Sequence, residues 1–81
     1  MGRKTLRDRR HLALMRVLRA TRIERGFKQK ELSLKLGRSE NYLTKIETGE
    51  RRLDLQEFFE LCEEMGVDPV DVFSRIARWV P

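Results

Sequence analysis

The chain has 81 residues and almost none of the side chains that build covalent or metal-centred sites, since it contains one cysteine and one histidine. Cys62 has no second cysteine to pair with, and its place in an apolar helical run predicts a small buried hydrophobic side chain. His11 has no other histidine and no cysteine near it, so the sequence offers no set of zinc ligands. No nucleophile has a base beside it, and no glycine loop could cradle a phosphate. We therefore expect neither an enzyme nor a cofactor.

Long apolar runs are missing as well. No stretch is long enough to cross a bilayer, and the opening sequence MGRKTLRDRR lacks the apolar core of a signal peptide. We therefore expect a cytoplasmic protein that contacts no membrane, and no segment indicates a small-molecule ligand. Hydrophobic residues make up 40% of the chain, which is enough for folding. The length fits one small domain, near the size at which a partner subunit adds useful stability.

Charge is distributed unevenly along the chain. Residues 1–30 contain eleven Lys and Arg against two Asp and Glu, whereas residues 54–73 contain seven Asp and Glu and no Lys or Arg. Such a dipole would draw a polyanion to the basic end and leave the acidic helix pointing away, although two ordinary solvated faces would give the same counts. Residues 1–10 are either a basic arm that reaches along a nucleic-acid backbone, a solvated tail, or the start of the first helix.

Capping and breaking signals predict one all-α domain at residues 11–81. It is built from five helices, the first of which can begin within residues 1–10. The expected helices cover about residues 6–25, 29–36, 40–48 and 55–65, with a fifth that starts at Pro69. Asp54 and Glu57 have the spacing of a capping box at the start of the fourth helix. Asp68 before Pro69 is typical of a helix start, because the missing N–H of proline is no loss at the first helical position.

The segment Gln29–Gly49 predicts two short helices joined by a tight turn. Each has apolar residues one turn apart on a single face, Leu32 with Leu36 and then Leu43 with Ile46. Gly37 can supply the corner, and the Ser39 hydroxyl suits the N-cap of the second helix. The outer face then keeps polar side chains of the types that reach base edges and phosphates: Glu40, Asn41, Thr44, Lys45 and Thr48. This layout is that of a helix-turn-helix, and it indicates double-stranded DNA as the partner.

The run from Leu18 to Phe73 resembles the phage-repressor-like (XRE, or Cro-type) helix-turn-helix family of bacterial and phage regulators, whose fold is lambda-repressor-like. The features that match in spacing are Arg22, the helix opening Gln29–Leu32, Gly37, Ile46–Glu47 with Gly49, and the turn Gly66–Asp68. The sequence departs from the family at Arg38, where an apolar residue commonly follows the glycine, and at Tyr42, where many members have a smaller residue. The resemblance implies a DNA-binding regulator in which the second helix of the motif, at about residues 40–48, is the recognition helix.

Three side chains are expected to read bases, because Asn41 can pair with adenine, Lys45 can donate to guanine, and Glu40 can accept from cytosine. By resemblance to the family, Gln29 contacts a phosphate at the start of its helix. Further backbone or flanking contacts are expected from Arg38, Ser39, Tyr42, Thr44, Thr48, Arg51 and Arg52. The alternative for Arg38 is that it lies over the turn without touching DNA, and for Tyr42 it is a packing role within the protein. Solvated loop charge is the alternative for Arg51 and Arg52.

The resemblance also implies a structural ion pair. In the family, an arginine of the first helix pairs with the glutamate that ends the recognition helix, and Arg22 and Glu47 occupy the matching places. A bidentate pair of this kind is directional, so we expect it to fix the angle between the two helices.

The fifth helix has more bulky apolar residues than one small core needs. They include Phe73, Ile76, Trp79 and Val80. One hypothesis is a homodimer interface with Ile76 and Trp79 at its centre. The alternative is a monomer in which Trp79 folds back on the first helix.

These features together predict a sequence-specific, double-stranded DNA-binding transcriptional regulator, a repressor that binds an inverted repeat as a homodimer. One alternative is an antitoxin, or another protein-interaction module, whose acidic fourth helix or apolar fifth helix binds a partner protein while DNA binding serves autoregulation. Another is nonspecific nucleic-acid binding driven by basic charge.

Overall fold

The computed structural model describes residues 2–80, with side chains from residue 9 onward. Its five helices are α1 (Gly2–Glu24), α2 (Gln29–Lys35), α3 (Tyr42–Glu47), α4 (Leu55–Met65) and α5 (Pro69–Arg78). The all-α, five-helix architecture expected from the sequence is confirmed. Among the described residues, no helix combines the length and the apolar character needed to span a bilayer.

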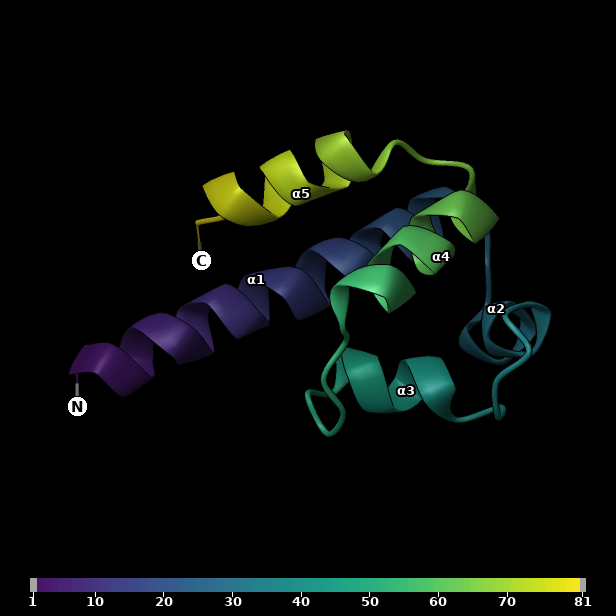
Figure 1. The fold of residues 1–81 in the computed structure, drawn as a ribbon, viewed down its shortest axis with the longest axis horizontal. Helices are drawn as coiled ribbons and strands as arrows, with labels where there is room; N and C mark the ends of the chain where they lie inside the picture. Colours follow the sequence, from purple (N-terminus) through teal and green to yellow (C-terminus); the bar gives the residue numbers. More distant parts are fainter. Residues whose placement is uncertain (1, 81) are drawn as a thin grey trace.

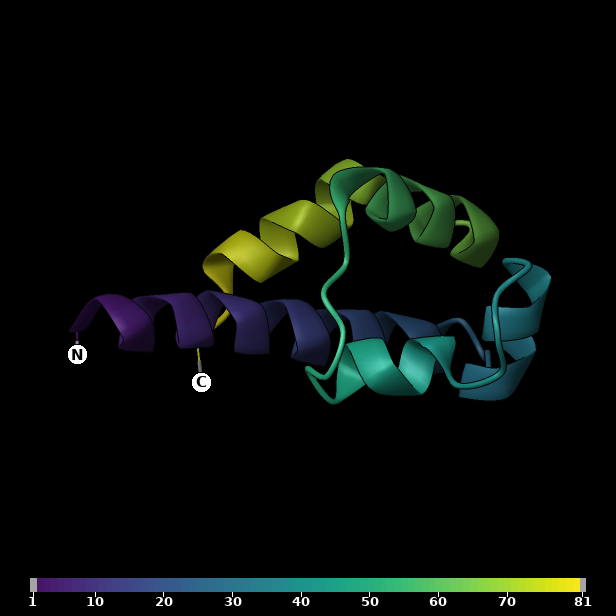
Figure 2. The ribbon, with the colours of Figure 1, turned by 60° about the horizontal axis from the view of Figure 1, so that its bottom comes forward.

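The long helix α1 is the element on which the others are arranged (Figure 1). α5 lies along it, and the turned view shows α3 beside α1 with α2 at the C-terminal end of α1 (Figure 2). α1 begins at Gly2 rather than near Leu6, so residues 2–10 are the start of this helix. The Arg and Lys residues there are good helix formers, which favours this extension. The side chains of residues 2–8 lie outside the part of the chain that the structure describes.

The core lies where the apolar stripes of the helices meet. Its buried members come from all five helices: Val17, Leu18, Leu32, Tyr42, Leu43, Ile46, Phe58, Leu61, Cys62, Met65 and Val72. Leu32, Leu43 and Ile46, which were expected to face inward from their helical spacing, are among them, and Leu36 is partly buried against the core. Burial raises the pKa of the Cys62 thiol to about 11, so this side chain stays neutral and packs as an apolar group.

The starts of α4 and α5 follow the capping signals read from the sequence. Asp54 Oδ1 accepts from the backbone N–H of Glu57 at 2.7 Å, and Glu57 Oε1 accepts from the backbone N–H of Asp54 at 3.0 Å. Asp68 Oδ1 accepts from Val70 N at 2.9 Å, with Pro69 at the first helical position. The predicted capping box and the predicted proline start are both present, and they determine where α4 and α5 begin.

The end of α5 folds back on the domain. Ile76 and Trp79 are partly buried and pack against the core, and Arg10 Nη1 of α1 donates to Ala77 O at 3.3 Å. These contacts cover part of the apolar surface of Ile76 and Trp79 within the chain, and their expected place at the centre of a dimer interface stays a prediction. The large apolar side chains of α5 and its C-terminal end that stay exposed are Val70, Phe73 and Val80.

Candidate nucleic-acid interface

The turn between α2 and α3 is built on Gly37. This residue has a φ of +72°, a left-handed conformation that a side chain would disfavour. Its N–H donates to Leu34 O at 2.9 Å, and Arg38 N donates to Ser33 O at 3.0 Å. These bonds satisfy the last carbonyl groups of α2 and reverse the chain toward α3, as expected for a helix-turn-helix corner.

A buried serine locks the two helices of the motif together. Ser33 of α2 is completely buried, and its hydroxyl donates to Gln29 O at 2.7 Å and accepts from Leu43 N at 3.1 Å. The hydroxyl therefore satisfies a free N–H in the first turn of α3 from a neighbouring helix. The sequence signal for this role was the place of Ser33 beside the buried Leu32, on the face where a small residue allows close helix contact.

The expected N-cap role of Ser39 is wrong. α3 begins at Tyr42 with Asn41 at its N-cap position, later than the start expected near Glu40. Residues 39–42 form a turn in which Ser39 O accepts from Tyr42 N at 3.1 Å. Because this turn precedes the helix, the Ser39 hydroxyl is too early in the chain to cap it. Ser39 is exposed and so is accessible to a partner.

The loop after α3 passes directly against α1 at Gly49. A Cβ at this position would lie 2.9 Å from Met15 Sδ and 3.5 Å from His11 Nε2. The φ of Gly49 is also +82°, so both the conformation and the space call for glycine. This close approach holds the C-terminal end of the recognition helix against α1.

The ion pair between Arg22 and Glu47 is present. Arg22 Nε donates to Glu47 Oε2 at 2.7 Å, and Arg22 Nη2 donates to Glu47 Oε1 at 3.1 Å. The two side chains are 10% and 3% exposed, and Arg22 Nη1 also donates to Phe27 O at 2.8 Å. This bidentate geometry connects α1 to the end of α3 and defines the angle between them.

Gln29 extends the same network. Its Nε2 donates to Glu47 Oε1 at 2.8 Å, and its Oε1 accepts from Thr44 Oγ1 at 2.9 Å. The side-chain amide of Gln29 thus bridges α2 and α3 within the protein. The amide nitrogen has a second hydrogen for the phosphate contact that the family resemblance implies, and that contact stays a prediction.

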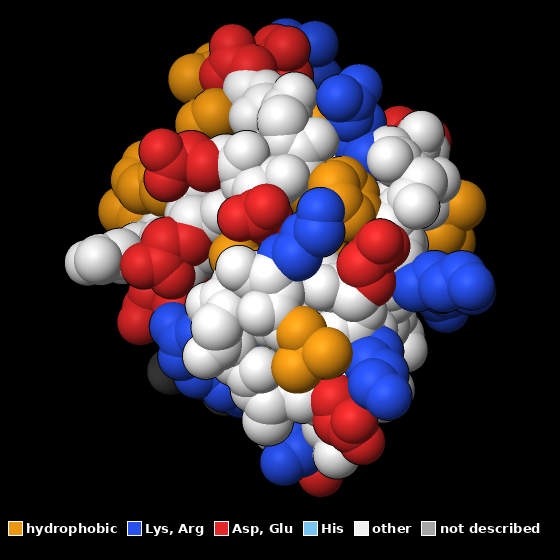
Figure 3. Space-filling model, turned by 90° about the vertical axis from the view of Figure 1, so that its right-hand side faces the viewer, with side chains coloured by type: hydrophobic (Ala, Val, Ile, Leu, Met, Phe, Trp, Pro, Cys, Tyr) orange, Lys and Arg blue, Asp and Glu red, His pale blue; other side chains and the backbone are white. Residues whose placement is uncertain are grey.

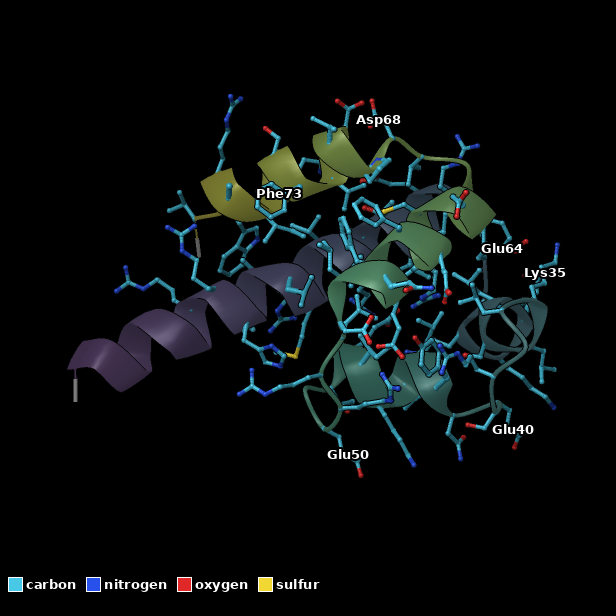
Figure 4. The ribbon with its side chains drawn as sticks, viewed as in Figure 1. Lys35, Glu40, Glu50, Glu64, Asp68 and Phe73 are labelled. Carbon is cyan, nitrogen blue, oxygen red and sulfur yellow. The ribbon has the colours of Figure 1, made fainter. Side chains whose placement is uncertain are left out.

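The outer face of α3 and its N-terminal approach expose the side chains expected to read bases. Glu40, Asn41 and Lys45 are all exposed, and Figure 4 shows Glu40 pointing away from the body of the protein, far from Phe73 on α5. Glu40 Oε2 lies 3.5 Å from Lys30 Nζ, but both side chains are more than half exposed, so this pair is weak and can exchange for other partners. Thr44 and Thr48 are exposed on the same side of α3.

Tyr42 lies in the interior, which agrees with its packing alternative and corrects the expectation of a DNA contact through its ring. It is 5% exposed, and the guanidinium carbons of Arg38 and Arg51 lie 4.9 and 4.8 Å from its ring centroid. Burial and the nearby Glu57 carboxylate raise the pKa of the Tyr42 phenol. The two arginines that the sequence associated with phosphate contacts therefore also pack on a buried ring of the recognition helix.

Glu57 joins these two arginines and was missed in the sequence, where it was counted among acids pointing away. Arg51 Nη1 and Nη2 donate to its two oxygens at 3.1 and 2.8 Å, and Arg38 Nη2 lies 3.3 Å from Oε2. The bonds from Arg51 and from the backbone N–H of Asp54 lower the pKa of Glu57 to about 2. The signal was its third position in the capping box, which turns a glutamate back toward the chain that precedes its helix.

One described face of the protein mixes charges of both signs. On the face formed around α2 and the end of α4, basic and acidic side chains are interspersed (Figure 3). Several pairs contribute, since Arg38 also lies 3.6 Å from Glu60, and Arg75 of α5 lies 3.3 Å from Glu24 of α1.

The remaining candidate residues lie at the edge of this surface. Thr48 Oγ1 donates to Lys45 O at 3.2 Å, and Arg52 is exposed in the loop after α3. Arg51 is not a free loop charge, because its guanidinium is held by Glu57. Within the part of the chain that the structure describes, no three His, Cys, Asp or Glu side chains are grouped to hold a metal ion.

Comparison with known proteins agrees with this geometry. The profile of the helix-turn-helix family matches residues 18–72. An XRE-family like protein from Pseudomonas syringae pv. tomato is 38% identical, with a TM-score of 0.87 over 99% of this chain and 98% of the other. The clp gene regulator ClgR from Corynebacterium glutamicum is 26% identical, with a TM-score of 0.76 over 84% of this chain and 72% or 88% of that protein in two structures. No curated protein matches the chain.

The family match covers more than half of the chain, and it includes the corner at Gly37, the buried pair of Arg22 with Glu47, and the exposed face of α3. The expected fold and family are both confirmed. The chain therefore belongs to the XRE (Cro-type) helix-turn-helix family of DNA-binding transcriptional regulators, which are not enzymes.

Proposed function

We propose that α3 enters the major groove of double-stranded DNA and reads a specific sequence. The observation that carries this proposal is a short helix with an exposed polar face, held from behind by the buried pair of Arg22 and Glu47. Asn41 is at the N-cap position of α3 and Lys45 lies one turn further on. This end of a recognition helix is the one that contacts base edges in helix-turn-helix complexes.

Each of the three base-reading residues has a distinct chemical role. The Asn41 side-chain amide would form a bidentate pair with adenine, in which its N–H donates to N7 and its oxygen accepts from N6–H. Lys45 would donate to O6 and N7 of guanine. Glu40 would accept from N4 of cytosine after its weak pair with Lys30 opens.

Phosphate contacts would surround this reading surface. The exposed hydroxyls of Ser39, Thr44 and Thr48 and the exposed guanidinium of Arg52 are suited to bind phosphate oxygens on either side of the groove. Gln29 would add one N–H from the start of α2. These contacts orient the protein without reading sequence, so their loss would weaken binding to all DNA alike.

We further propose that the protein is a repressor that binds an inverted repeat as a homodimer in the cytoplasm, where bacterial DNA is located. An apolar groove of about 600 Å³ opens between α1, α4 and α5, lined by Leu14, Leu53, Leu55, Phe58, Phe73, Ile76 and polar residues at its edge. Phe73 is 61% exposed at this groove and Val70 is 71% exposed nearby on α5. A protruding apolar side chain beside an apolar hollow is what a self-complementary two-fold interface requires.

Selection of bound fragments from a pool of random double-stranded DNA tests this function. We expect an enriched inverted repeat whose half-sites are about 34 Å apart, one helical turn or a multiple of it. An enriched single half-site would contradict the dimer, and the absence of any enriched sequence would contradict specific recognition. Competition with excess random DNA gives an independent measure, because a specific complex survives it.

A further inference from the structure

The recognition helix is flanked by two arginines that converge on one carboxylate. α3 has six residues, with Arg38 in the turn before it and Arg51 in the loop after it. Nη2 of Arg38 and Nη2 of Arg51 lie 3.3 and 2.8 Å from the same oxygen of Glu57, which belongs to α4. A single side chain outside the helix-turn-helix therefore contacts both flanks of the helix that faces DNA.

The position of this carboxylate is well defined. Its side chain is 10% exposed and receives the two N–H groups of Arg51, the backbone N–H of Asp54 at 3.0 Å, and the nearby guanidinium of Arg38. Both arginines also lie over the ring of Tyr42, the first residue of α3. Charge-assisted bonds with several donors permit few orientations, so movement of either flank would break them.

From this geometry we infer that Glu57 is a positioning residue for DNA recognition. By fixing the segments before and after α3, it sets the orientation in which Asn41 and Lys45 meet the bases. Glu57 acts through Arg38 and Arg51 and does not itself touch DNA. The inference depends on the proposed reading role of α3, and it adds a second support to the pair of Arg22 with Glu47.

A positioning role of Glu57 would affect sequence specificity, whereas its charge alone would affect binding to any DNA. Base contacts by Asn41 and Lys45 require close geometry, whereas attraction to phosphates depends mainly on the number of positive charges. Removing the negative charge of Glu57 adds to the net positive charge, which by itself strengthens binding to any DNA. A misplaced α3 instead weakens binding to the correct sequence only. The ratio of the affinity for the correct sequence to the affinity for random DNA separates these effects.

The test uses Glu57→Gln in the full chain. Glutamine at this position still serves a capping box, so the bond from Asp54 N is retained while the charge that holds the arginines is lost. Glu64→Gln is the matched control, because Glu64 is an exposed acid on the same helix and its loss changes the net charge equally. The dissociation constants for the sequence selected by the wild type and for random DNA of equal length are measured at one salt concentration.

We expect the ratio of specific to random affinity to fall about tenfold in Glu57→Gln, comparable to one mismatched base pair, and to stay unchanged in Glu64→Gln. Equal ratios in both variants would overturn the inference. If melting curves show Glu57→Gln unfolded at the assay temperature, Arg51→Lys takes its place, since lysine keeps the charge but loses the bidentate geometry. An unchanged ratio in that variant would likewise overturn the inference. A wild type that prefers no sequence would instead contradict the proposed function itself.

Discussion

The α2–α3 region is distinguished by its buried polar contacts, and the α4–α5 region by its exposed apolar side chains. α3 is tied down by directional polar contacts, namely the Arg22–Glu47 pair, the Ser33 hydroxyl, and the arginines on Glu57. The α4–α5 region instead leaves large apolar side chains exposed, with Leu55 at 66% and Phe73 at 61%. Polar contacts fix orientation, which a reading surface needs, whereas exposed apolar area favours association with another chain.

The largest effect on folding is expected from Glu47→Ala. Its side chain is 3% exposed, so the substitution leaves the guanidinium of Arg22 buried without its main partner. We expect a loss of about 3 kcal/mol in the free energy of unfolding and, because less of the protein is then folded, weaker binding to all DNA sequences together. Urea denaturation measures the first effect, and binding to specific and random DNA measures the second.

A small loss of stability from Glu47→Ala, within that of an exposed substitution such as Glu64→Ala, would contradict this account. It would mean that α3 keeps its place without the pair, and that buried polar contacts do not fix the α2–α3 region.

Gly49→Ala should have the next largest effect. The new Cβ would meet Met15 Sδ at 2.9 Å in a residue with a φ of +82°. Since Met15 is flexible, much of the cost comes from the backbone, and we expect a loss of about 2 kcal/mol. Gly26→Ala is a matched control, because that glycine also has a positive φ but has no atom within 4 Å of the added Cβ. Equal losses in thermal melting would show that contact with α1 contributes nothing.

The Glu57 cluster should make stability depend on pH. The folded-state pKa of Glu57 is lowered from 4.5 to about 2, so its stabilising effect is complete above pH 4.5 and disappears as the pH falls through 2. The wild type should therefore be more stable than Glu57→Gln at pH 6, and this difference should shrink by more than half at pH 3. Urea denaturation at the two pH values checks it, and a constant difference would show that the carboxylate is not held as described.

The smallest effect on folding is expected from Phe73→Ser on the apolar side. Because this ring is mostly exposed, the monomer should lose about 0.5 kcal/mol or less. Sedimentation at micromolar concentration should show twice the chain mass of 9.7 kDa for the wild type and the single mass for Phe73→Ser. Leu34→Ser, an exposed apolar position on α2, should leave the dimer intact. A wild-type mass of one chain would contradict the proposed dimer.

The fold and the outline of the site could be predicted from the sequence because the signals are local. Apolar spacing placed Leu32, Leu43 and Ile46 inside, and the capping residues Asp54 and Asp68 located the starts of α4 and α5. These features depend on a few neighbouring residues, so they can be read without knowing how the helices pack.

The contacts between distant segments could not be predicted in the same way. The hydroxyl that accepts from the first turn of α3 belongs to Ser33 and not to Ser39. Glu57, which holds Arg51, lies among acids that look equivalent in the sequence. Trp79 packs against the core because α5 turns back along α1, which its own apolar pattern does not reveal. The pair of Arg22 with Glu47 was an exception, since the family resemblance carried information that the residues alone did not.

Base reading by the exposed face of α3 is the central function proposed for this protein, and the Asn41→Ala substitution probes it. Asn41 is exposed and its side chain does not cap α3, so the folded protein should be little changed. Selection from random DNA with this variant should give the wild-type site with preference lost at one base pair in each half-site, at a cost of about 1–3 kcal/mol for the original base. An unchanged preference at every position, or an equal loss at all of them, would contradict the account.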